Sequence, residues 1–268
     1  MKRDDAKIVQ ARPLFENWKS VAGRLRKAQR ILLLLDFDGT LVGFRAKPEE
    51  VRLDAELRGL LQRLGRRPDV TLGFISGRRR ADLRERINVR GARYWGLHGW
   101  ESATGLPLKR ETRRKLATAR YLLEKETQGL KGIWIEDKQA SIVLHYRTAS
   151  VRNARWARKV MRQVSSSFTS DFRILKGKKI WEMMPRELQG KGATVQKLVE
   201  EAGKGALVIY AGDDTTDESV FATLKGGITL HVGHNPHTKA RFRVRNPEEV
   251  RRFLERLDEE LVLRHDTK

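Results

Sequence analysis

The chain has 268 residues, a formal net charge of +22 at pH 7 and no cysteine. This length suffices for one large domain or two smaller ones. The lack of thiols excludes disulfides, thiolate metal sites and thiol nucleophiles, so any metal must be bound by oxygen or imidazole. No apolar run approaches the roughly 20 residues of a membrane span, and the N-terminal MKRDDAK lacks the apolar core of a signal peptide, so we expect a cytoplasmic protein with no membrane partner.

The positive charge would attract anions in general, including nucleic acid and phosphorylated metabolites. We find neither aromatic residues interleaved with basic ones on strands nor a recognition helix with the spacing of a turn. We therefore interpret the charge as arginine used freely on solvated faces. A nucleic-acid partner is not expected, and we expect a monomer that acts on a small molecule.

The first third of the chain predicts a parallel β-sheet. Apolar residues at helical spacing after Pro13 predict an amphipathic helix that reaches Leu25. Residues 31–35 are an unbroken apolar run, which is typical of a strand buried on both faces. A helical pattern over 54–64 and a strand pattern over 70–75 follow and complete a βαβ unit, and 81–87 predicts a further helix.

The pattern changes near Thr104. Helices are predicted over 110–127 and 149–168, with strands over 133–137, 141–147, 172–175 and 179–184. The first pattern then resumes, with helices over 193–202, 218–224 and from Pro247 onward, and strands over 206–210 and 227–232. We predict an α/β fold: a doubly wound, parallel, Rossmann-like core (1–103 and 188–268) with an inserted smaller α+β cap domain (104–187), placed to act as a lid.

Acidic residues follow the first strand at once. Asp36 and Asp38 are two residues apart, so on extended backbone both carboxylates point the same way. Ligands of open α/β sheets bind beyond the carboxyl ends of the strands, where this pair would lie. The alternative is a solvated Asp-Gly turn. Ser76, at the end of the second strand, is either part of a phosphate cradle or simply a helix cap.

A second acidic cluster, GDDTTDE, follows the strand over 206–210. Its carboxylates would repel one another unless a cation lies among them. If this strand is adjacent to 31–35, Asp36 and Asp213 can bind one Mg²⁺, and Lys191 can supply a second positive charge. The alternative is a helix start that Asp217 caps.

These side chains together suggest phosphoryl transfer through an aspartyl phosphate. Asp36 would attack phosphorus, and Asp38 would protonate the leaving oxygen and later activate water. No Gly-rich Walker loop is present, which argues against an ATPase.

The four segments DFDGT, ISGR, GKG and GDDTTDE resemble, in this order, the motifs of the haloacid dehalogenase superfamily of phosphatases. The resemblance implies that Asp36 is the nucleophile and that Asp38 is the acid and base and binds the metal through its backbone carbonyl. It also implies that Ser76 and Lys191 bind the phosphate, that Asp213 binds the metal with Asp214 nearby, and that Asp217 orients Lys191.

Further segments are similar to the trehalose-6-phosphate phosphatases: GLHG at 96–99, EDK at 136–138, HYR at 145–147 and KIWE at 179–182. This resemblance implies Mg²⁺-dependent hydrolysis of trehalose 6-phosphate, with substrate bound by Arg78, His98, Glu136, Lys138, Arg147 and Glu182. Glu182 is also notable by itself, because a carboxylate on an apolar strand face needs a polar partner. That partner is either a sugar hydroxyl or, as the alternative, Lys138.

The high basicity and the bulky Trp100 beside the site depart from what we associate with this family. Two alternatives therefore stay open. The first is another sugar-phosphate phosphatase of the superfamily, acting on sucrose phosphate or a glycosylated phosphoglycerate. The second is a catalytically idle, basic relative that binds nucleic acid.

Overall fold

The computed structural model describes residues 10–44, 50–177, 179–188 and 190–266. The stretch MKRDDAK, considered above for a signal peptide, lies outside them. The described residues form two compact units, one within Met1–Ala103 and Gly190–Lys268 and the other within Thr104–Gln189. The insertion was predicted to span 104–187, and the carbonyl oxygen of the next residue, Leu188, accepts a 3.0 Å hydrogen bond from Arg173 of the inserted unit.

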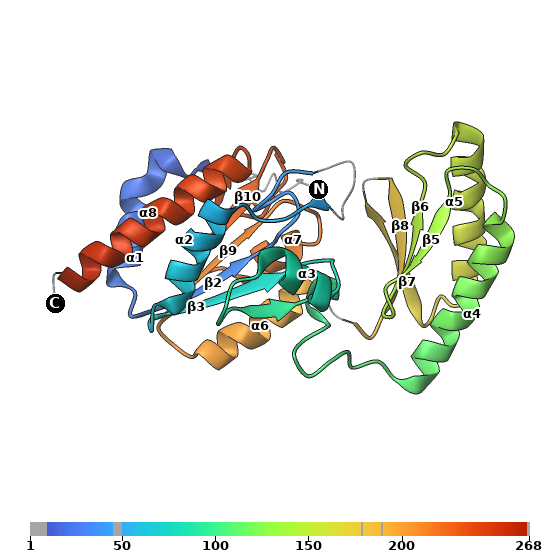
Figure 1. The fold of residues 1–268 in the computed structure, drawn as a ribbon, viewed down its shortest axis with the longest axis horizontal. Coiled ribbons are helices and arrows are strands. Elements are labelled where there is room, and N and C mark those ends of the chain that lie inside the picture. Colours follow the sequence, from blue (N-terminus) through green and yellow to red (C-terminus); the bar gives the residue numbers. More distant parts are fainter. Residues whose placement is uncertain (1–9, 45–49, 178, 189, 267–268) are drawn as a thin grey trace, which may run out of the picture. The chain divides into compact units, whose positions relative to one another are not determined.

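The first unit contains a seven-stranded sheet in which each described pair of neighbours is parallel (Figure 1). Its order is β1-β11-β10-β9-β2-β3-β4. The strands are β1 (Arg12–Pro13), β2 (Arg30–Leu35), β3 (Val70–Ile75), β4 (Arg93–Trp95), β9 (Ala206–Gly212), β10 (Ile228–Val232) and β11 (Phe242–Val244). The predicted α/β class with a parallel sheet is confirmed.

Strand β2 is buried on both faces, as its apolar run predicts. Leu33 and Leu35 belong to the core cluster that receives helices α1 (Trp18–Lys27), α2 (Ala55–Arg66), α3 (Arg80–Ile87) and α8 (Pro247–Asp266). Leu32 and Leu34 belong to the cluster on the opposite face, with helices α6 (Lys191–Ala202) and α7 (Glu218–Thr223). Asp36 comes two residues after Leu34, so the alternation directs it to the face that α6 covers.

Some elements differ from the sequence-based expectation. The helix expected after Pro13 begins as a 3-10 turn, Phe15–Asn17, before α1. Strands β1, β4 and β11 have two or three residues each and were not predicted. Such short strands contain too few residues for a period of two to be recognised.

The inserted unit is a four-stranded antiparallel sheet in the order β5-β6-β8-β7, with two helices on one face (Figure 1). Its elements are α4 (Arg110–Thr127), β5 (Trp134–Asp137), β6 (Ile142–His145), α5 (Val151–Ser166), β7 (Phe172–Gly177) and β8 (Ile180–Pro185). All of them correspond to predicted elements, within a few residues at the ends, and the α+β class of this unit is confirmed.

Within the described ranges, we find no helix whose length and hydropathy suit a membrane crossing.

Candidate active site

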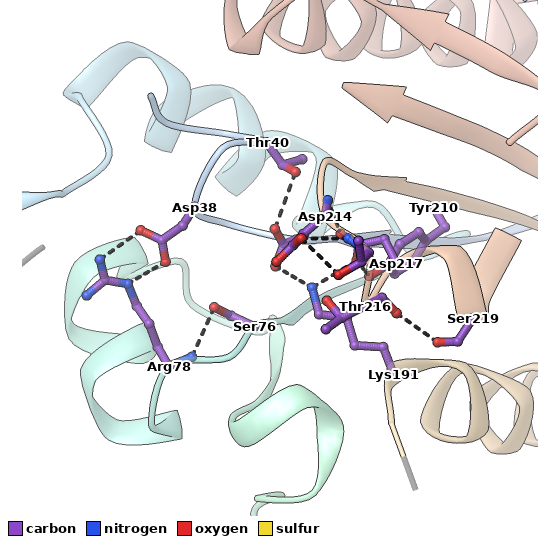
Figure 2. A network of polar contacts seen from close by, with 12 residues as sticks. Asp38, Thr40, Ser76, Arg78, Lys191, Tyr210, Asp214, Thr216, Asp217 and Ser219 are labelled. Atoms are coloured by element: carbon purple, nitrogen blue, oxygen red, sulfur yellow. Dashed lines mark hydrogen bonds and ion pairs between the residues drawn. The ribbon is translucent and has the colours of Figure 1, made fainter. Parts of the chain in front are cut away.

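Asp36 and Lys191 meet at the carboxyl ends of two neighbouring strands. The backbone amide of Asp36, directly after β2, donates to the carbonyl oxygen of Ala211 in β9 at 3.0 Å. Lys191 is the first residue of α6, and its Nζ lies 2.8 Å from Asp36 Oδ1 and 2.8 Å from Asp217 Oδ1. Figure 2 shows Lys191 pointing toward Asp217, which the hydroxyl of Tyr210 also contacts. All of these side chains are buried.

Three carboxylates lie close together in this group. Asp36, Asp213 and Asp217 each offer a carboxylate oxygen, and these atoms lie within 4.8 Å of one another. Burial lowers the pKa of Lys191, but the carboxylates of Asp217 and Asp36 outweigh burial and raise it, so the lysine stays charged. Burial and the charges of Asp217 and Asp213 raise the pKa of Asp36 well above its ordinary value, although Lys191 opposes this. Lys191 thus binds two of the three carboxylates, and the set as a whole offers oxygen donors that fit a hard divalent cation.

Two glycines make room for this arrangement. A Cβ atom at Gly39, whose φ is +86°, would lie 2.2 Å from Asp213 Oδ2. A Cβ atom at Gly212 would lie 2.2 Å from Asp217 Cγ. The glycine of DFDG and the glycine of AGDD therefore allow the acidic side chains to approach the backbone closely.

Asp38 is held by Arg78 (Figure 2). Arg78 Nε lies 2.6 Å from Asp38 Oδ2, and Arg78 Nη2 lies 2.7 Å from Asp38 Oδ1. Arg78 Nη1 also donates to Asp82 Oδ2 at 3.0 Å. Burial opposes the charge of Arg78, yet the hydrogen bond with Asp38 raises its pKa overall. Arg78 was predicted to bind substrate, and in this structure its guanidinium group binds two carboxylates.

Ser76 and His98 lie at the carboxyl end of β3. The Oγ atom of Ser76 accepts a 3.2 Å hydrogen bond from the backbone amide of Arg78, and its carbonyl oxygen accepts one of 2.8 Å from the amide of His98. The imidazole lies against Gly77, where a Cβ atom would come within 2.9 Å of His98 Cε1. Trp100 is buried, with its ring centroid 5.9 Å from that of His98. Phosphate binding by Ser76 stays a prediction.

The predicted metal residue Asp214 has an exposed side chain. Its Oδ1 accepts from the amide of Thr215 at 2.6 Å, and its own amide donates to Asp217 Oδ2 at 3.0 Å. Asp214 thus forms part of the turn that supports Asp217, and metal binding by its carboxylate stays a prediction.

Two side chains that contact the buried carboxylates of Asp36 and Asp217 were not predicted from the sequence. The hydroxyl of Tyr210 donates to Asp217 Oδ1 at 2.5 Å, and that of Thr40 donates to Asp36 Oδ2 at 3.4 Å. Burial, followed by the charges of Asp217 and Asp36, raises the pKa of Tyr210 well above its ordinary value. The signal for Tyr210 was its place as the polar side chain in the apolar run LVIYA, since a buried hydroxyl needs a partner.

In the inserted unit, Glu136 and Glu182 lie on one face of the sheet, because both pair with Val143 of β6. Glu182 is buried, accepts from Ser141 Oγ at 2.5 Å and lies 3.5 Å from Lys138 Nζ. The ion pair with Lys138, considered above as the alternative, is therefore present. Whether these groups also bind sugar stays a prediction.

Glu136 has a further partner that the sequence did not predict. Its Oε2 lies 2.8 Å from His145 Nε2. Burial raises the pKa of Glu136, but the hydrogen bond with His145 and the charge of Lys138 lower it overall. Arg147 is exposed in the segment after β6, outside this cluster.

Comparison with known proteins identifies the family. A model of the family described as trehalose-phosphatase matches residues 34–248. A trehalose-phosphate phosphatase of Mycolicibacterium paratuberculosis is 31% identical over 255 residues, which cover 85% of this chain and 62% of that protein. A bifunctional trehalose-6-phosphate synthase/phosphatase of Thermoproteus tenax is 33% identical over 244 residues, covering 86% of this chain and 32% of that protein. The chain thus spans less than two thirds of these relatives.

A solved structure has the same fold. The C-terminal domain of trehalose-6-phosphate phosphatase from C. albicans superposes with a TM-score of 0.78 at 22% identity, covering 94% of this chain and 99% of that one. The resemblance stated from the motifs is confirmed. The match to residues 34–248 includes both acidic clusters, Lys191 and the whole inserted unit, and so the chain belongs to the trehalose-phosphatase family.

Proposed function

We propose that this chain is a Mg²⁺-dependent phosphatase that hydrolyses trehalose 6-phosphate to trehalose and phosphate through an aspartyl-phosphate intermediate. The observation that carries the proposal is the group formed by the buried Asp36, Lys191 and Asp217 and the half-buried Asp213 at the ends of adjacent strands, in a member of the trehalose-phosphatase family.

The proposed reaction has two steps. In the first, Asp36 attacks phosphorus, the bond from phosphorus to the sugar oxygen breaks, and Asp38 donates a proton to that oxygen. In the second, Asp38 takes a proton from water, the water oxygen attacks phosphorus, and the carboxylate of Asp36 is regenerated. Lys191 offsets negative charge beside Asp36, Ser76 binds the phosphate, and Asp217 with Tyr210 orients the lysine.

Asp36, Asp213 and the backbone carbonyl of Asp38 would hold the Mg²⁺, with Asp214 nearby. When bound, the ion would neutralise negative charge on the nucleophile and the phosphate. The oxygen-rich donor set supports this assignment. Burial and the charges of Asp217 and Asp213 raise the pKa of Asp36, which must be ionised to attack, and a cation beside it would oppose that rise.

We further propose that the inserted unit is a cap that reads the sugar through Glu136, Lys138 and Glu182, with Arg147, and that Arg78 and His98 contribute from the core. Two acceptors and a donor on one sheet face suit sugar hydroxyls. A site that pairs with hydroxyls penalises a substrate that leaves its groups unpaired by roughly 1–3 kcal/mol per group. In this proposal the protein acts in the cytoplasm, as a monomer.

The test is phosphate release in the presence of Mg²⁺ from trehalose 6-phosphate, sucrose 6-phosphate, glucosyl-phosphoglycerate and glucose 6-phosphate. We expect the highest kcat/KM for trehalose 6-phosphate. Glu182→Ala should reduce its preference over glucose 6-phosphate by about ten- to a hundredfold. If the wild type turns over one of the other sugar phosphates best, the trehalose assignment is wrong and the phosphatase mechanism is retained.

A further inference from the structure

We propose that Trp134 is a specificity-determining residue, an aromatic platform against which a pyranose ring of the substrate packs. This inference rests on the proposed function and extends it to a residue that the motifs do not include. Trp134 is the first residue of β5 and remains 53% exposed.

The indole lies on the same sheet face as the proposed sugar-reading carboxylates. Trp134 and Glu136 are two residues apart on β5, and Glu136 shares its face with Glu182. Asp137 points the other way, because its Oδ2 lies 2.7 Å from Nη1 of Arg120 in α4. Helices α4 and α5 lie together on one face (Figure 1), so Trp134 belongs to the face that these helices leave uncovered.

The orientation of the indole is fixed by its neighbours. Its ring stacks on that of His145, with centroids 3.5 Å apart and planes 5° from parallel. The imidazole is held in turn by Glu136, 2.8 Å from Nε2. One face of the indole is therefore covered by the imidazole of His145, which is oriented by Glu136, a proposed sugar-binding residue.

This environment suits a sugar ring. Pyranoses present C–H groups on their ring faces, and an aromatic face carries partial negative charge that attracts them while apolar area is buried. Binding pockets commonly combine such aromatic walls with a few polar groups that fix orientation. A disaccharide phosphate has a second ring to place on the platform, whereas glucose 6-phosphate has only the ring that carries the phosphate. Trp134 should therefore favour the disaccharide.

The experiment compares Trp134→Ala with the matched control Trp156→Ala. Of the six tryptophans, all within the described residues, these two are exposed, and Trp156 is 45% exposed on α5. We expect Trp134→Ala to lower the ratio of kcat/KM for trehalose 6-phosphate to that for glucose 6-phosphate about tenfold, mainly through KM. Trp134→Phe should restore most of the ratio, and Trp156→Ala should keep it.

A binding measurement separates recognition from turnover. In the Asp36→Asn background, the Kd of trehalose 6-phosphate should rise about tenfold with Trp134→Ala and stay constant with Trp156→Ala. The wild-type change in tryptophan fluorescence on adding trehalose should be lost in Trp134→Phe.

The two proposals fail in different ways. If the wild type prefers trehalose 6-phosphate and Trp134→Ala, with an unchanged melting temperature, keeps that preference, the platform is wrong and the proposed function stands. If the wild type hydrolyses no sugar phosphate, the proposed function fails. In that case the platform is also wrong if trehalose does not change the fluorescence of Trp134, and it is retained if trehalose does.

Discussion

Arg78 is the residue whose surroundings depart furthest from its expected role. It was predicted to bind substrate, yet its guanidinium group donates to both oxygens of Asp38 and to Asp82. Two parallel bonds fix the plane of a carboxylate as well as its position. Arg78 is therefore suited to orient the proposed general acid, and its contribution should depend on whether the leaving group needs a proton.

We predict that Arg78→Met lowers kcat for trehalose 6-phosphate by about tenfold or more. The loss should be much smaller for p-nitrophenyl phosphate, because that leaving oxygen departs without a proton. Steady-state kinetics with both substrates measure this difference. Arg79→Met is the control, since Arg79 pairs with Glu101 instead. A higher KM for both substrates, with kcat unchanged, would show that Arg78 binds the substrate, as first predicted.

Asp36→Asn should abolish turnover, because an amide cannot form the acyl phosphate, and should not destabilise the protein. Because the pKa of Asp36 is raised in the folded state, folding favours its protonated form. The free energy of unfolding therefore falls as the pH rises above the carboxyl pKa of the unfolded chain, and this loss is present at pH 7. Asparagine removes one of three neighbouring negative charges, and Lys191 keeps its hydrogen bond to Asp217. Calorimetry without Mg²⁺ should give an equal or higher melting temperature. A clear decrease would mean that the bond from Lys191 to Asp36 outweighs the repulsion.

At the scale of elements, helices and strands were predicted correctly where the segment was long enough for its pattern of apolar residues to be recognised. Strand β2 has five buried apolar residues in a row, and α5 has a regular apolar stripe, so both were found. Helical spacing would put Val151 on this stripe, yet Val151 is exposed at the start of the helix. Strands β4 and β11 have three residues each and are stabilised by pairing with their parallel neighbours, β3 and β10. Such pairing between distant segments cannot be seen in a local sequence pattern.

The residues of the candidate site also fall into two groups, those that the sequence could place and those that it could not. Asp36, Asp213, Asp217 and Lys191 are adjacent to strand or helix ends and could be placed by topology. Lys138 was named as a possible partner of Glu182 and does pair with it. The partners of Asp38 and Glu136, and Ser141 as a second partner of Glu182, were not predicted, since each is a side chain from another turn or strand. Trp134 was missed because an exposed aromatic residue has no sequence signal of its own.

Helix α2 offers a test of local stability. Asp54 precedes it, and its Oδ1 accepts from the amide of Leu57 at 2.8 Å, while Asp54 also pairs with Arg251. Asp54→Ala should lower the free energy of unfolding by about 1 kcal/mol, because it removes the cap. Asp54→Asn should retain most of it, since asparagine caps as well. Urea denaturation measures both. Equal losses in the two variants would assign the effect to the ion pair with Arg251.

At the scale of the whole molecule, the candidate metal site joins parts of the chain that are far apart in sequence. Asp36 comes from the N-terminal segment of the core, and Asp213 and Asp217 come from the segment after the inserted unit. These carboxylates lie together only when β2 and β9 pair, as they do from Arg30 with Ala206 to Leu35 with Ala211. A cation bound there would bind the folded state and not the unfolded chain, so metal affinity should contribute to folding stability.

We therefore predict that Mg²⁺ stabilises the protein as well as activating it. Chelation with EDTA should stop phosphate release, and Mg²⁺ should restore it. At a concentration one hundred times its Kd, the ion would add about 2.7 kcal/mol to the free energy of unfolding, which calorimetry detects as a higher melting temperature. Asp213→Asn should lose most of this increase and require far more Mg²⁺ for turnover. Glu248→Gln, an exposed acid at the start of α8, should keep both responses. Full activity after exhaustive chelation, together with a melting temperature that Mg²⁺ does not change, would show that the carboxylates need no bound metal.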